Sequence, residues 1–177
     1  IAVLRRARGG RVDPEMVERS RSEAVIMLEK IVSGGQSGVD RAALDVAREL
    51  GIPHGGWCPR GRWAEDGPIP LRYPLQETPK ADPAQRTAWN LRDSDATLVL
   101  TRGEHAGGTA LTIALARECD HPLRIIDLAR DAPRAPIRDW LQDRGVGILN
   151  IAGPRESEAP GIGRAAAAWL AALLDGD

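Results

Sequence analysis

The 177-residue sequence has no phenylalanine, one tyrosine and two cysteines, and its formal net charge is −1. Cys58 and Cys119 lie far apart and form no C-x-x-C pair, so neither a zinc site nor a disulfide framework is predicted. The balanced charge argues against nucleic-acid binding, which usually requires a basic surplus. No apolar run approaches the roughly 20 residues that span a bilayer, and no secretory signal pattern occurs. We therefore expect a cytoplasmic protein without a membrane segment.

The length suits one domain with a sizeable core and leaves little room for a second. We expect residues 27–177 to form this single domain. Residues 1–26 are rich in arginine and begin with isoleucine, which suggests that the native start is missing or processed. They form either an appended N-terminal extension or an extra helix over residues 14–28, for which Asp13 is the N-cap and Pro14 the first residue.

Strand-length apolar runs alternate with helical patterns from residue 31 to the end. Strands are expected at 31–32, 52–59, 96–101, 122–128 and 147–152, and helices at 42–50, 83–92, 110–119, 136–144 and 162–174. This alternation predicts an α/β fold in which helices cover both faces of a parallel sheet. The segment 60–79 is dense in glycine, proline and charge, and we expect it to be a long binding loop.

The first strand runs into a turn that we call the first elbow, composed of Gly34, Gly35, Gln36, Ser37 and Gly38. Glycines here let a ligand approach main-chain N–H groups, and the N–H groups at a helix start favour anions. We expect the elbow to hold an anionic group through these N–H groups and the Ser37 hydroxyl. The spacing matches neither the dinucleotide fingerprint nor the Lys-bearing phosphate loop, and a tight turn without a ligand remains the alternative.

The same strand, glycine turn and helix order occurs twice more. In the second elbow, residues 102–109, Gly107, Gly108 and Thr109 are predicted to form a second anion cradle. The third elbow, residues 153–157, follows the last strand. Elbows on neighbouring strands would face one crevice at the carboxyl ends of the sheet, where open α/β folds bind ligands.

Several side chains beside the elbows are further candidates. Arg41, Arg102 and Arg155 can form charge-assisted bonds with an anion, or else belong to surface salt bridges. Trp57 can stack on a ligand ring, although a tryptophan beside a strand end is more often a core residue. Cys58 is a candidate ligand for a soft metal, but a buried free cysteine is the simpler interpretation, so the metal ligands remain unknown.

Five of these motifs, in this order, resemble the molybdenum cofactor carrier family, which is related to the LOG and DprA superfamily. They lie at residues 31–44, 55–59, 92–97, 107–109 and 149–157. The resemblance implies a Rossmann-like three-layer α/β/α fold with a mostly parallel sheet, and a homo-oligomer such as a dimer or tetramer. It also implies binding, storage and protection of molybdenum cofactor or of a related oxyanion such as molybdate, with molybdenum enzymes as clients.

A rival hypothesis is enzymatic. LOG-type N-glycosidases, which act on nucleoside monophosphates, carry the motif P-G-G-x-G-T-x-x-E, whose glutamate performs acid–base catalysis. Thr112 stands at the position of that glutamate, and a threonine hydroxyl without an adjacent base cannot serve as a general acid or base. The substitution favours a carrier without catalytic residues. A sensor of a nucleotide-derived ligand would use the same elbows, and the sequence leaves this alternative open.

Overall fold

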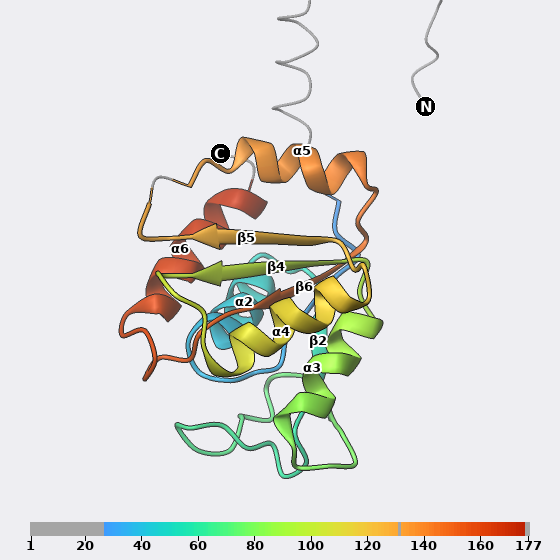
Figure 1. The fold of residues 1–177 in the computed structure, drawn as a ribbon, viewed down its shortest axis with the longest axis vertical. Coiled ribbons are helices and arrows are strands. Elements are labelled where there is room, and N and C mark those ends of the chain that lie inside the picture. The colour runs from blue at the N-terminus through green and yellow to red at the C-terminus, as the bar shows by residue number, and fades with distance from the viewer. Residues whose placement is uncertain (1–26, 131, 176–177) are drawn as a thin grey trace, which may run out of the picture.

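The computed structural model describes residues 27–130 and 132–175, which form a six-stranded sheet in which every pairing is parallel (Figure 1). The expected extension over residues 1–26, and the extra helix proposed there, fall outside these ranges. The strands are β1 (Lys30–Val32), β2 (His54–Cys58), β3 (Leu75–Glu77), β4 (Ala96–Thr101), β5 (Leu123–Asp127) and β6 (Ile148–Ala152). Their order across the sheet is β3-β2-β1-β6-β4-β5.

The last strand, β6, lies in the middle of the sheet between β1 and β4. Val32 of β1 is paired with Asn150 of β6, and Val99 of β4 with Ala152. The strands that carry the first and second elbows are therefore not neighbours, and the third elbow lies between them. All three elbows share the carboxyl edge of the sheet, because every strand runs in the same direction.

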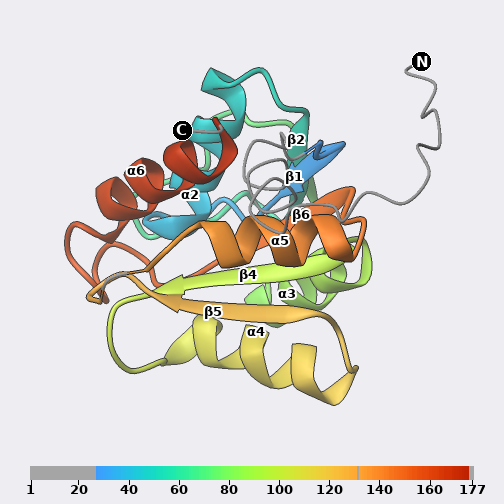
Figure 2. The ribbon, with the colours of Figure 1, turned by 90° about the horizontal axis from the view of Figure 1, so that it is seen from above.

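Helices cover both faces, which gives three layers and confirms the predicted fold class (Figure 2). The helices are α2 (Val39–Glu49), α3 (Pro83–Arg92), α4 (Gly107–Glu118), α5 (Ala135–Asp143) and α6 (Ile162–Leu174). On one face α2 packs against α6, and α5 joins the same apolar core. On the other face α3 packs against α4. No helix in the described ranges is long and apolar enough to cross a bilayer.

Several predicted boundaries agree with the structure, including those of α3, β4 and α6. Asp82 caps α3 as expected, because its carboxylate accepts a hydrogen bond from the Ala84 N–H at 2.9 Å. Two helices begin three residues earlier than predicted, at Val39 and Gly107, because the last residues of each elbow already form the first helical turn.

We expected the segment 60–79 to be a loop throughout, but it contains the short edge strand β3. Only Leu75 of this three-residue strand is buried, so no apolar alternation marks it in the sequence. A small apolar cluster fixes the segment to α2 and β2, and its members are Leu44, Cys58, Ala64, Ile69, Tyr73 and Leu75. The Cys58 side chain is fully buried in this cluster, and burial raises the pKa of its thiol. These facts match a small core residue better than a metal ligand.

Candidate functional site

A cavity of about 260 Å³ lies at the carboxyl edge of the sheet, beside the ends of β6 and β4. The chain leaves β6 towards α6 on one face and leaves β4 towards α4 on the other. Open α/β sheets bind ligands at such topological switch points, so we call this space the switch-point cavity. Residues of all three elbows and of α3 line it, among them Gln36, Arg86, Gly107, Thr109, Gly153 and Arg155.

The second elbow presents the start of α4 to the cavity. Gly107 has a φ of 48°, a conformation that favours glycine. In the first turn of the helix, the N–H groups of Thr109 and Ala110 donate to the Ala106 carbonyl. The N–H groups of Gly107 and Gly108 precede these bonds, and no side chain in the described structure caps the helix. This end of α4 therefore offers the cavity donors and a positive dipole end.

Two buried polar atoms at this cavity have no hydrogen-bond partner within the described residues. They are Thr109 Oγ1 and Arg86 Nε, and Thr109 is only 3% exposed. Buried polar groups are nearly always satisfied in folded proteins, because an unpaired one costs the desolvation of that group. Both residues line the cavity, so these two unsatisfied groups make it the candidate ligand site.

Arg86 is held at the cavity by a buried ion pair. Its Nη1 lies 2.9 Å from Asp40 Oδ2, and the two side chains are 14% and 2% exposed. Burial raises the pKa of Asp40, while Arg86 and backbone hydrogen bonds from Gln36 and Gly153 oppose that rise. The absence of a side chain at Gly34 makes room for the guanidinium, because a Cβ there would collide with it.

The first elbow already has partners within the protein. The Ser37 N–H donates to Gln36 Oε1 at 3.0 Å, and the Ser37 hydroxyl donates to the Glu65 carboxylate. Gly35 packs against Ile69 and Leu75, so little space remains beside it for a ligand. The protein's own polar groups therefore occupy several of the positions that we expected an anion to take.

Glu65, which the sequence did not single out as a site residue, joins the 60–79 segment to two elbows. Its carboxylate accepts hydrogen bonds from the hydroxyls of Ser37 and Ser157, and also one from the Ser157 N–H at 3.1 Å. Glu156 completes the network by donating its N–H to Ser37 Oγ at 3.1 Å. Burial raises the pKa of Glu65, but hydrogen bonds from Ser157 and Ser37 outweigh that effect and lower it.

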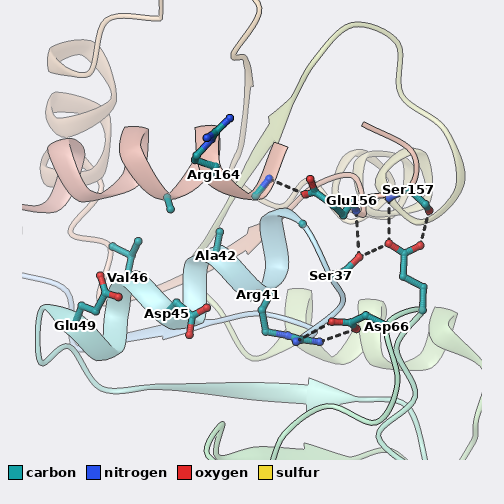
Figure 3. Close-up of a pocket in the computed structure, with 14 residues that line it drawn as sticks. Ser37, Arg41, Ala42, Asp45, Val46, Glu49, Asp66, Glu156, Ser157 and Arg164 are labelled. Atoms are coloured by element: carbon teal, nitrogen blue, oxygen red, sulfur yellow. Dashed lines mark hydrogen bonds and ion pairs between the residues drawn. The ribbon is translucent and has the colours of Figure 1, made fainter. Parts of the chain in front are cut away.

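Ser37, Gly38 and Arg41 line a second, more open space of about 840 Å³ between α2 and α6 (Figure 3). Arg41 forms a two-pronged contact with Asp66, with both N–O distances at 3.2 Å, and its Nε donates to the Gly35 carbonyl at 3.0 Å. Arg41 thus connects the first elbow with the 60–79 segment. We call this space the α2–α6 groove.

The remaining candidates are divided between the cavity and other places. Arg155 lines the switch-point cavity, and its Nε lies 3.1 Å from the Glu158 carboxylate. Arg102 is exposed and donates to a loop carbonyl outside the cavity. Trp57 is also outside it, since its ring meets Trp89 edge-on at 4.6 Å and its indole N–H donates to an aspartate. The cavity thus gathers Gln36, Gly107, Gly108, Thr109 and Arg155 from the predicted set.

Several polar side chains at the cavity are already engaged within the protein. The Thr112 hydroxyl donates to the Gly108 carbonyl at 2.9 Å, so it is committed within α4. Of the three carboxylates at the cavity, Asp40 and Glu158 are each paired with an arginine, and Asp82 accepts the Ala84 N–H as the cap of α3. A search of the described residues for three or more clustered histidine, cysteine, aspartate or glutamate side chains finds no group suited to a metal ion.

Comparisons with known proteins identify a family and a similar crystal structure. Residues 31–174 match the model of the circularly permutated YpsA SLOG family. A crystal structure described as a putative molybdenum carrier protein from Syntrophus aciditrophicus SB has 44% sequence identity and a TM-score of 0.81. The match covers 84% of this chain and 96% of that chain. No curated protein matches the sequence. The resemblance inferred from the sequence motifs is confirmed.

The Glu65 network makes stability depend on pH. We expect Glu65→Gln to lower the free energy of unfolding by about 1 to 2 kcal/mol at neutral pH, because charge-assisted hydrogen bonds are lost. The folded-state pKa of Glu65 lies below the ordinary value of 4.5. The stabilisation is therefore fully present above that value and is lost as the pH falls through the folded-state pKa.

Urea unfolding of the wild type and of Glu65→Gln, measured between pH 7 and pH 3, checks this prediction. The difference between the two proteins should shrink towards acid. A difference that stays constant over the whole range would show that the ionised carboxylate is not the stabilising form.

Proposed function

We propose that this chain, which belongs to the circularly permutated YpsA SLOG family, is a carrier that binds an oxyanion-bearing cargo in the switch-point cavity. The observation that carries the proposal is the buried, unpartnered Thr109 hydroxyl at the uncapped start of α4. We propose molybdenum cofactor or molybdate as the cargo. This choice is supported by 44% identity to a protein described as a putative molybdenum carrier.

The donors at the cavity suit such a cargo. Molybdenum cofactor is a pterin with a phosphate and a dithiolene-held oxo-molybdenum, so it offers anionic oxygens at both ends. Main-chain N–H groups at a helix start, a hydroxyl and a guanidinium Nε all donate to oxyanions. The cavity, at about 260 Å³, is slightly smaller than the roughly 300 Å³ at which ligand pockets usually begin. We propose that the cavity encloses one anionic end of the cofactor and that the rest of the cofactor extends over the rim of the cavity.

Two arginines and three carboxylates line the cavity, so its side chains supply no excess of positive charge. Arg86 is paired with Asp40 and Arg155 with Glu158, while Asp82 caps α3. An anion would therefore be held mainly by neutral donors and by the dipole of α4, an arrangement that suits reversible loading and release better than permanent binding. The engagement of all three cavity carboxylates, two in ion pairs and Asp82 as a helix cap, also supports a carrier over an acid–base catalyst. From the family resemblance we further propose a homo-oligomer that delivers its cargo to molybdenum enzymes.

Thr109→Val tests the binding site, because valine keeps the shape and removes the hydroxyl. We expect molybdate affinity to fall on the order of tenfold, since a hydrogen bond to a charged oxygen is lost. We also expect the variant to be at least as stable as the wild type, because the hydroxyl has no partner to lose. Isothermal titration with molybdate and thermal unfolding without it measure the two effects.

Thr112→Val is the matched control, one turn along the same helix, because its hydroxyl is already committed to the Gly108 carbonyl. It should bind molybdate as the wild type does. The proposal fails if Thr109→Val loses stability but not affinity. If AMP stabilises the wild type and neither molybdate nor molybdenum cofactor does, the cargo is a nucleotide-derived ligand instead.

Glu158→Gln should have the opposite effect on binding. A Cβ at Gly107 would lie 3.1 Å from Glu158 Oε1, so this carboxylate repels an anion at the start of α4 while it also occupies Arg155. Removing its charge should tighten molybdate binding several-fold at low salt, because the repulsion between two partly exposed charges is of that size. The same titration measures the gain, which should diminish as salt is added. Weaker binding by this variant would place the anion elsewhere.

A further inference from the structure

Trp63 lies on the 60–79 segment, lines the switch-point cavity and is 51% exposed. The other four tryptophans each have a partner. Trp57 and Trp89 meet edge-on, Trp140 lies under two arginines, and the indole N–H of Trp169 donates to the Ala132 carbonyl. In the described structure no hydrogen bond, ring contact or cation contact involves Trp63. The large apolar ring is therefore free to meet a ligand.

The backbone just before Trp63 is unusually well fixed. Arg62 has a φ of 53°, a left-handed conformation that is unfavourable for a residue other than glycine. Its guanidinium holds the loop in this shape by donating to four carbonyls, those of Ile69, Pro70, Tyr73 and Leu75, at 2.9 to 3.0 Å. Unfavourable backbone conformations persist where the surroundings enforce them, and they concentrate at binding sites.

The residues after Trp63 are anchored as well. Ala64 is buried in the small apolar cluster at 3% exposure. The Glu65 N–H donates to Gln36 Oε1 at 2.9 Å, and its carboxylate is held by the two elbow serines. The exposed indole is thus carried by a backbone that is fixed on both sides. A pre-positioned ring loses little conformational entropy when a ligand stacks on it.

We propose that Trp63 is a stacking platform for a planar nitrogen heterocycle, attached to the anion that α4 holds. The inference rests on the proposed function and narrows the cargo class. An oxyanion alone would use only the cavity, whereas a ring-bearing cargo would also contact the indole at the rim. Trp57 does not compete for this role, because its ring and its N–H are already engaged in the fold.

The test compares a ring-bearing probe with a ring-free probe. Isothermal titration measures the dissociation constants of a pterin monophosphate and of inorganic phosphate for the wild type, Trp63→Leu and Trp63→Phe. We expect Trp63→Leu to weaken pterin monophosphate binding on the order of tenfold, the effect of losing one stacking contact between a base and an aromatic side chain. Phosphate binding should be unchanged. Trp63→Phe, which keeps a ring, should retain most of the affinity.

Leu71→Ala is the matched control on the same segment, because Leu71 is 86% exposed and does not line the cavity. It should bind both probes as the wild type does. Pterin monophosphate binding that is equally tight in the wild type and in Trp63→Leu would overturn the stacking role and leave the anion site intact. If the wild type binds molybdate but not pterin monophosphate, the stacking role fails alone; if it binds neither these probes nor molybdate, the proposed function fails, and the inference fails with it.

Discussion

The carboxyl edge of this protein depends on one buried carboxylate, that of Asp40. It lies in the first turn of α2 and is paired with Arg86, which belongs to α3 on the opposite face of the sheet. Backbone hydrogen bonds from Gln36 and Gly153 also stabilise its charged form, so a single side chain connects two helical layers and two elbows. Removing either partner would leave an unpaired buried charge, which is strongly destabilising. Asp40 accepts the Gln36 N–H and Glu65 the Ser37 hydroxyl, so two polar groups of the first elbow are already engaged, which supports the start of α4 as the proposed anion site.

The position of β6 explains why the three elbows meet. Starting at β6, the strands β1, β2 and β3 follow in order towards one edge, and β4 and β5 occupy the other side. A doubly wound sheet has the same strand order, with its first strand at the centre, except that here the central strand comes last in the chain. The arrangement agrees with the match to a circularly permutated family. The switch point therefore lies between segments that are about fifty residues apart in sequence.

The fold could be predicted from the sequence because its signals are local. The apolar run of β4 and the Asp82 cap of α3 depend on a few adjacent residues. The switch-point cavity could be predicted only in part. The glycines of the second elbow, with alanine at the N-cap, identify an uncapped helix start, but the other walls of the cavity come from distant residues. Arg86 gave no signal, because its role requires the vacant side-chain position at Gly34. Trp63 gave no site signal either, since its place at the cavity follows from contacts that Arg62 and Glu65 make with other parts of the chain.

We propose that an oxyanion binds at the start of α4 rather than at the first elbow. The anomalous difference density of a crystal soaked in molybdate, recorded at the molybdenum absorption edge, locates the anion. We expect a peak in the switch-point cavity, within hydrogen-bonding distance of Thr109 Oγ1. A peak at Gly34–Gly38, or no peak in the cavity at a molybdate concentration that stabilises the protein in solution, would contradict it.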